Sequence, residues 1–304
     1  MTADLTDPDT DLLRRNGFDA VFHLAGIAHH LADSDDYWRV NVAASLRLAR
    51  LAAGASLKHF VFVSSVKAGL EAETPPVSEL VDSLLGPGGG ETPGESTAAN
   101  GSAGDALGHR GLSYGRSKLI AERALRQLLD GQSTALTIVR PALVYAQDAP
   151  GHLAWLKRWA ALRMPVPPAG GVRSMVSRDD LVALLIQLIE DTSASPIEAA
   201  AYRELTLTDG EHYSAQRIYR AYSVHCKRRP LIRTVPTWAW RLGLASLDRW
   251  RGLNDPAASS WSKLMGEETY ESIGLQTVGF TPRLTLEAAL GLEKLGLETL
   301  GLDT

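Results

Sequence analysis

Residues 59–65 read His-Phe-Val-Phe-Val-Ser-Ser, a short apolar run that ends in two hydroxyl side chains. A run rich in Val and Phe, without a polar face, predicts a strand that is buried on both sides, as in a parallel sheet. Residues 19–25, Asp-Ala-Val-Phe-His-Leu-Ala, have the same character, and an amphipathic segment, residues 37–53, lies between the two runs. A strand, a helix and a strand in this order predict a βαβ unit.

The alternation continues beyond this unit. A helix is expected at residues 113–129 and a strand at 135–145, with Pro141 marking the point where that strand leaves the sheet. Between them, residues 86–104 are rich in glycine and small polar residues, which predicts a flexible loop. A tryptophan-rich helix is expected at 153–163. The sequence therefore predicts an α/β fold built on a doubly wound parallel sheet.

Composition narrows the classes of function. The chain has 304 residues, 45% of them hydrophobic, and a formal net charge of −4, which gives no bulk electrostatic case for binding nucleic acid or an anionic membrane. Its single cysteine, Cys226, excludes an internal disulfide and a multi-cysteine metal site. Adjacent His29 and His30 have no partner at ligand spacing, so no metal is expected. The acidic first residues carry no targeting signal, and we expect a cytoplasmic protein.

The sharpest chemical signal is the pair Tyr114 and Lys118, which stand four positions apart at the start of the helix expected at 113–129. This spacing places the phenol and the ammonium on one helical face. A nearby cation lowers the pKa of a tyrosine, so Tyr114 is predicted to exchange a proton with an alcohol near neutral pH. The alternative is that both side chains belong to an ordinary solvated helix face.

The serine pair at the end of the run 59–65 supplies the context for this signal. A hydroxyl at the carboxyl end of a parallel strand lies where such sheets bind ligands. Ser65 is therefore predicted to hydrogen-bond the substrate oxygen that Tyr114 protonates or deprotonates. The alternative is a serine that merely caps the junction between strand and loop.

These residues stand within a longer series of motifs that resembles the extended short-chain dehydrogenase/reductases, and specifically their NAD-dependent epimerases, dehydratases and reductases of nucleotide sugars. The matching segments occur in the family's order along nearly the whole chain. They are Asp4-Leu5, His23-Leu24-Ala25-Gly26, Asn41, Val63-Ser64-Ser65, Tyr114 with Lys118, Arg140-Pro141 through Val144-Tyr145, Arg173 through Val176, Asp179-Asp180-Leu181, and Gly279 through Pro282 with residues 286–290.

The resemblance implies a role for each matching residue. It implies that Ser65, Tyr114 and Lys118 are catalytic. The cofactor, NAD or NADP, is expected at Asp4, Leu5, Leu24, Ala25, Gly26, Asn41, Ser64, Tyr114, Lys118 and Pro141. The substrate is expected at Ser65, Val66, Lys67 and Arg173, and the run 65–67 resembles members that act on UDP-N-acetylhexosamine-type sugars in polysaccharide synthesis.

The resemblance also implies the organisation of the chain. Residues 1–165 are expected to form a partial Rossmann-like NAD(P)-binding domain. Residues 166–304 are expected to form a smaller, mixed substrate-binding region that is interleaved with the first. Family members often form dimers through helices that include the tyrosine helix, so a homodimer is expected as well.

Three departures from the family pattern bear on this interpretation. The family opens with a strand and a GxxGxxG turn that binds the pyrophosphate, whereas the only glycines before residue 30 are Gly17 and Gly26. The segment between Ser65 and Tyr114 is longer than usual, and Ala146 stands where the family has glycine. The first departure predicts that about two βα units are missing, through a late start codon or a truncated gene, and that the chain as given is poorly stable.

Two functions follow. The first is an NAD(P)-dependent sugar-nucleotide epimerase or reductase in which Tyr114 moves a proton while hydride passes to or from the nicotinamide. The alternative is a truncated, non-catalytic member of the family, or an interaction protein, that is unable to bind a dinucleotide.

Overall fold

The computed structural model describes residues 17–28, 34–70, 112–149, 151–194, 202–230, 235–252 and 259–292. The chain divides into two compact units, each made of two segments. The first unit comprises Met1–Arg140 and Leu185–Thr206, and the second comprises Pro141–Leu184 and Leu207–Thr304. The two units are interleaved along the chain, and the first change of unit falls at Arg140 rather than at the expected residue 165.

The first unit is built on a four-stranded sheet with the order β1-β2-β3-β6. These strands are β1 (Ala20–His23), β2 (His59–Val63), β3 (Ala135–Pro141) and β6 (Tyr202–Leu207). Strand β2 pairs in parallel with β1 and with β3, so that Phe62 lies beside His23 on one side and Ile138 on the other. The predicted α/β fold with a parallel sheet is thus confirmed.

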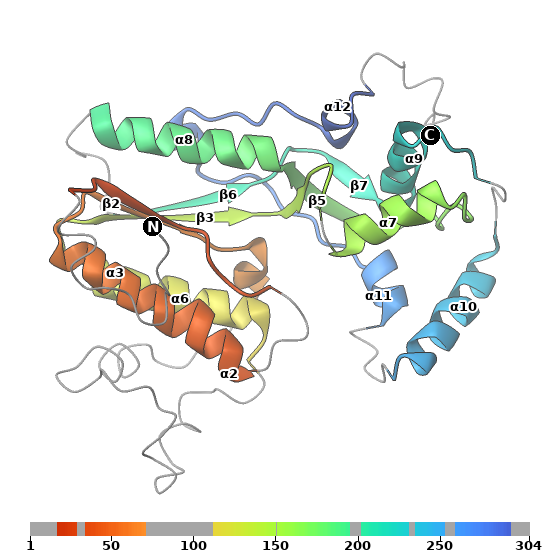
Figure 1. The fold of residues 1–304 in the computed structure, drawn as a ribbon, viewed down its shortest axis with the longest axis horizontal. Coiled ribbons are helices and arrows are strands. Elements are labelled where there is room, and N and C mark those ends of the chain that lie inside the picture. Colours follow the sequence, from red (N-terminus) through yellow and green to blue (C-terminus); the bar gives the residue numbers. More distant parts are fainter. Residues whose placement is uncertain are drawn as a thin grey trace, which may run out of the picture. The chain divides into compact units, whose positions relative to one another are not determined.

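Helices cover both faces of this sheet. Helix α3 (Ala44–Gly54) and helix α6 (Tyr114–Leu129) lie side by side on one face, and helix α8 (Arg178–Ala194), which enters this unit at Leu185, lies on the other (Figure 1). The core of this unit consists of fully buried apolar side chains, among them Leu46, Ala49, Phe60, Phe62, Ala121, Leu125 and Ile138. Burial of these helix stripes against β2 and β3 is the main force that holds the unit together.

The second unit contains a three-stranded sheet with the order β4-β5-β7. Its strands are β4 (Leu143–Tyr145), β5 (Val172–Ser177) and β7 (His212–Ser214), and β5 runs parallel to β4 and antiparallel to β7. Its helices are α7 (Gly151–Ala161), α9 (Ala215–His225), α10 (Thr237–Trp250), α11 (Ser260–Met265) and α12 (Leu286–Ala289). Helices α7 and α9 pack together, with Leu156, Ile218 and Tyr219 fully buried in the core of this unit.

The structure alters two of the predicted elements. The segment expected as one helix at 37–53 opens as a π-helix, Tyr37–Ala43, and becomes α-helical only at Ala44. The strand expected at 135–145 splits: β3 ends at Pro141, and Leu143–Tyr145 pairs with β5 in the other sheet. Proline at this position has no N–H to offer a neighbouring strand, whereas the N–H of the next residue, Ala142, still donates to the carbonyl of Leu207 at the end of β6, at 2.9 Å.

Other predicted features lie outside the described residues. These are Asp4 and Leu5, the pair His29 and His30, and the loop expected at 86–104. Within the described ranges, no helix combines the length and the apolar character needed to cross a bilayer.

Candidate active site

The candidate catalytic residues are carried by two neighbouring elements of the first unit. Ser64 and Ser65 follow directly after β2, and a short 3-10 helix, Val66–Leu70, begins after them. Tyr114 is the first residue of α6, and the Oγ of Ser113 caps this helix by accepting a hydrogen bond from the N–H of Arg116 at 3.1 Å. The cap fixes the place where the helix begins, and therefore the direction in which Tyr114 leaves it.

The structure brings Tyr114 and Ser65 together. Ser65 lies close enough to the phenol to lower the pKa of Tyr114, and the Oγ of Ser65 accepts a hydrogen bond from the N–H of Lys67 at 3.3 Å. The ring of Tyr37, from the π-helix, lies 6.4 Å from the ring of Tyr114, measured between centroids. The phenol is therefore held between the end of β2 and the π-helix rather than on an open helix face.

Lys118 lies one helical turn further along α6 and is 3% exposed. Its Nζ donates a hydrogen bond to the carbonyl of Val63 at 3.1 Å and lies 4.7 Å from the centre of the Phe62 ring. Burial lowers the pKa of Lys118 to about 8, although the nearby carboxylate of Glu122 opposes this change. The ammonium is thus tied to the last residues of the strand that leads to Ser65.

The pKa of Tyr114 moves in the direction opposite to the one predicted. Burial raises it, the proximity of Ser65 lowers it only in part, and Tyr37 adds to the increase. The expectation that Lys118 would depress this pKa is wrong for this structure, because the desolvation of the phenolate outweighs any attraction to the ammonium. Tyr114 is a protonated phenol at neutral pH.

Asn41 is the buried centre of a hydrogen-bond network behind the tyrosine. Its side chain accepts from the N–H of Ile27 at 2.8 Å and donates to the carbonyl of Ile27 at 3.0 Å and to the Oγ of Ser117 at 2.9 Å. Ser117 in turn donates to the carbonyl of Tyr114 at 2.8 Å. The π-helix that carries Asn41 is therefore tied to the first turn of α6.

Gly26 occupies a position with no room for a side chain. A Cβ built there would lie 2.9 Å from the Nζ of Lys118 and 3.1 Å from the Oδ1 of Asn41. The neighbouring Leu24 is 55% exposed, an unusual state for a leucine that follows a sheet strand, and Ala25 is half-buried. These residues present bare backbone and an apolar side chain to solvent beside Lys118.

Ser64 differs from Ser65 in its surroundings. Its N–H bonds the carbonyl of Val139 at 2.7 Å, but its buried Oγ has no hydrogen-bond partner among the described residues. A buried hydroxyl without a partner costs free energy, and such a group indicates a missing polar ligand. The residues expected at the nicotinamide end of the cofactor therefore have a chemistry that suits nicotinamide and its ribose. They are Leu24 to Gly26, Ser64 and Lys118.

Two functional candidates were missed by the sequence analysis. The buried carboxylate of Glu122 forms two hydrogen bonds with the guanidinium of Arg140 at the end of β3, and Arg140 also pairs with Glu204. His23 is buried, bonds the Oγ of Ser45 at 2.8 Å, and has a pKa lowered to about 4 by burial and by Lys118. Glu122 could have been found from the sequence, because it lies one helical turn from Lys118 on the same helix face.

The remaining predicted residues are spread over both units. Val66 is buried, whereas Lys67 is exposed. Pro141 is buried as the last residue of β3. Arg173 lies in β5 of the second unit, 8% exposed, and donates to the carbonyl of Lys263 at 2.8 Å.

Arg173 retains an unused donor. Its Nε is buried without a hydrogen-bond partner among the described residues, and so is the Nε2 of His152 at the start of α7. Burial lowers the pKa of Arg173 despite the attraction of Glu268. Burial, Arg173 and Lys263 together lower the pKa of His152 to about 4. A buried guanidinium N–H that lacks an acceptor, such as the Nε of Arg173, is suited to an anionic ligand.

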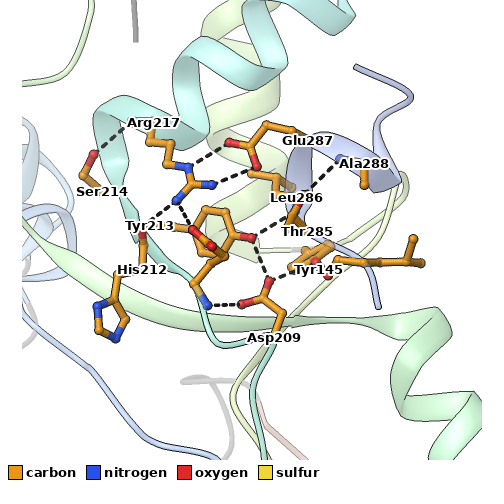
Figure 2. Close-up of polar contacts among 12 residues, drawn as sticks. Tyr145, Asp209, His212, Tyr213, Ser214, Arg217, Thr285, Leu286, Glu287 and Ala288 are labelled. Atoms are coloured by element: carbon orange, nitrogen blue, oxygen red, sulfur yellow. Dashed lines mark hydrogen bonds and ion pairs between the residues drawn. The ribbon is translucent and has the colours of Figure 1, made fainter. Parts of the chain in front are cut away.

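A second polar cluster in the same unit serves the fold instead. The carboxylate of Asp209 accepts hydrogen bonds from the hydroxyls of Tyr145 and Tyr213, at 3.0 and 2.7 Å (Figure 2). Arg217 binds Glu287 through two hydrogen bonds, at 2.8 and 3.1 Å, and lies over the ring of Tyr213. These contacts join α9 and α12 to the ends of the strands, and their hydrogen-bonding groups are occupied.

Comparison with known proteins agrees with the fold and the motifs. A family model of NAD-binding proteins, described as male sterility protein, matches residues 4–189. The chain belongs to the NAD-dependent extended short-chain dehydrogenase/reductase family. Both the predicted family and its cofactor class, NAD or NADP, are thereby confirmed at the level of the family.

Individual relatives of this family member are distant. A UDP-glucose 4-epimerase from Vibrio cholerae is 27% identical over 231 residues, which cover 73% of this chain, and the chain spans 61% of the length of that relative. MoeE5, solved with UDP-glucose and NAD, is 18% identical with a TM-score of 0.62, and the match covers 96% of this chain and 83% of that one. The enzyme WbmG from Bordetella bronchiseptica, solved with NAD, is 16% identical with a TM-score of 0.59, over 97% and 77% of the two chains.

Proposed function

We propose that this family member is an NAD(P)-dependent epimerase or reductase of sugar nucleotides whose proton-transfer site is formed by Ser65, Tyr114 and Lys118. The observation that carries the proposal is the proximity of Tyr114 to Ser65, with the buried Lys118 one helical turn away. Relatives that act on or bind UDP-sugars support the substrate class. The run Ser65 to Lys67 favours UDP-N-acetylhexosamines and a role in polysaccharide synthesis.

In the proposed mechanism, Tyr114 exchanges a proton with the sugar oxygen at the reacting carbon. The hydroxyl of Ser65 bonds the same oxygen and fixes its position relative to the phenol. Because Tyr114 is protonated at neutral pH, it is prepared to donate a proton to a ketosugar, which is the reductive direction. In the oxidative direction the phenol must first lose its proton, and the ammonium of Lys118 stabilises the resulting phenolate.

The nicotinamide, when bound, supplies the hydride chemistry. The nicotinamide end of the cofactor would be held by Leu24, Ala25, Gly26 and Ser64, and Lys118 would bind the adjoining ribose. Asn41 keeps these residues in place by bonding Ile27 and the first turn of α6. Among the described residues, no glycine-rich turn follows a strand.

Within the second unit, Arg173 is a candidate for binding an anionic group. Arg173 has a buried Nε without an acceptor, which a phosphate oxygen would satisfy. His152 is placed in the same cluster and offers a second nitrogen. A cytoplasmic location and a homodimer remain predictions for this protein.

Calorimetric titration with NAD, followed by incubation with a panel of UDP-sugars, tests the proposal. We expect NAD to bind and at least one UDP-sugar to be converted to its epimer or its reduced form. A protein that binds no NAD, in a folded state verified by circular dichroism, would instead be the non-catalytic family member considered above.

A further inference from the structure

Helix α10 of the second unit has two different apolar faces. One face packs into the protein through Trp240 and Leu244, which are 6% exposed and contact α11. The other face carries Trp238 and Leu242, which are 66% and 62% exposed, and the helix ends at Trp250, which is 83% exposed. A helix that only covers a protein core has a polar outer face, so this second face requires an explanation.

The exposed residues form a continuous stripe. Trp238, Leu242, Ala245 and Arg249 follow the spacing i, i+4, i+7 and i+11, which places them on one line along the helix. All four are exposed. Single exposed apolar residues are common, but two large ones on one line of a helix, with Trp250 at its end, form a patch.

The exposed charges that α10 and its C-cap carry beside this stripe are all positive. Arg241 and Arg249 are exposed on the helix, and the exposed Arg251 caps its carboxyl end. The only acidic residue of α10, Asp248, is 6% exposed and is occupied by hydrogen bonds to Ser260. The outer face of α10 therefore combines tryptophan, leucine and arginine without a carboxylate.

We propose that the outer face of α10, defined by Trp238, Leu242, Arg249 and Trp250, docks this protein onto an anionic lipid bilayer. Tryptophan is favoured at the boundary between headgroups and acyl chains, because its ring is apolar while its N–H remains hydrated. Arginines beside the buried stripe are attracted to acidic headgroups. This is attachment of one helix parallel to the surface and not a span of the membrane.

Charge separates this partner from the main alternative. A second copy of the chain docked through the same face in a twofold arrangement would bring the arginines of one copy (Arg241, Arg249 and Arg251) close to those of the other. An acidic lipid surface, by contrast, attracts all three arginines. The formal net charge of −4 concerns the whole chain and conceals this local patch, which is why composition alone gave no reason to expect a membrane partner.

Co-sedimentation of the full chain with vesicles tests this proposal. We expect binding to vesicles that contain phosphatidylglycerol and not to vesicles of phosphatidylcholine alone, and we expect salt to weaken it. The double variant Trp238→Ser/Trp250→Ser should lose binding. Arg249→Glu should weaken it at least fivefold, the factor that corresponds to ~1 kcal/mol for one basic residue near an anionic surface.

Matched controls keep the result interpretable. Ile273 is 63% exposed in the same unit but away from α10 in sequence, so Ile273→Ser removes a comparable exposed side chain and should bind vesicles like the wild type. Circular dichroism establishes that each variant is folded. Equal sedimentation with both kinds of vesicle, no sedimentation with either, or a dimer that the tryptophan variant dissociates would each overturn the proposal.

Discussion

The carboxylate of Glu122 receives two hydrogen bonds from the guanidinium of Arg140, the longer of them 2.9 Å, inside the first unit. Glu122 is 3% exposed and lies one helical turn beyond Lys118 on α6, while Arg140 stands at the end of β3. Arg140 therefore holds the carboxylate of Glu122 in place beside the buried ammonium of Lys118. This carboxylate raises the pKa of Lys118, whereas burial lowers it.

Replacing this charge should change the pH dependence of the reaction. In Glu122→Gln the amide retains the shape but loses the charge, so the pKa of Lys118 should fall below 8. The alkaline limit of kcat should move to lower pH with it. Glu204→Gln is the matched control, because Glu204 also pairs with Arg140 but does not act on Lys118. An unchanged profile in Glu122→Gln would contradict this coupling.

Removing Arg140 should destabilise the protein strongly. Arg140→Ala leaves Glu122 buried and uncompensated, and breaking a buried pair in this way costs about 3–5 kcal/mol of unfolding free energy. Arg178→Ala breaks the exposed pair with Asp148 and should cost less than about 1 kcal/mol. Urea denaturation of both variants measures the difference. Equal losses of unfolding free energy in the two variants would mean that the buried pair stabilises the protein no more than the exposed one.

A side chain at Gly26 should disturb the site without unfolding the protein. In Gly26→Ala the new Cβ meets the Nζ of Lys118 and the Oδ1 of Asn41, so the ammonium must move. We expect turnover to fall by at least tenfold while the unfolding free energy changes by about 1 kcal/mol. Gly243→Ala in α10 meets no atom within 4 Å and serves as the control, with full activity and slightly higher stability.

Stability should fall in mild acid because of buried histidines. Burial, with a contribution from Arg203, lowers the pKa of His59 to about 4, and His23 has a similarly lowered value. Between pH 6.5 and 4 the unfolded chain binds protons that the folded chain does not, so stability declines as the pH falls through this window. Each histidine contributes up to about 3 kcal/mol to this decline.

One substitution isolates this effect. His59 bonds the Oγ1 of Thr137 at 2.8 Å, and glutamine can keep a hydrogen bond there without titrating. The unfolding free energy of His59→Gln should therefore vary less between pH 6.5 and 4 than that of the wild type. A curve parallel to that of the wild type would show that His59 is not buried as described.

The fold was largely predictable because its decisive signals are local. The runs 19–25 and 59–65 and the helix beginning near Tyr114 appear in the structure almost as predicted, since apolar runs and amphipathic periodicity reflect burial directly. The π-helix at Tyr37–Ala43 could not be predicted. It contains Asn41, whose side chain bonds Ile27 and Ser117, two residues that are distant in sequence.

The placement of Tyr114 and Lys118 on one helix was predictable, but the electrostatics of these candidate residues were not. The spacing of Tyr114 and Lys118 predicted their shared helix face, yet the direction of the Tyr114 pKa was wrong, because burial cannot be read from spacing. Glu122 was overlooked because its partner Arg140 comes from another element. Pairing between elements and the degree of burial are tertiary properties, and both lie beyond a single sequence.

The most direct test of the central claim is the turnover of Tyr114→Phe, measured with the UDP-sugar that the wild type converts. Removing the hydroxyl should reduce kcat by at least a hundredfold, since it eliminates the proton donor. NAD affinity, measured by calorimetry, and the unfolding free energy should remain close to wild type, because the aromatic ring and its contact with Tyr37 are preserved. Turnover that persists at the wild-type rate in a folded, NAD-binding variant would contradict the role of Tyr114.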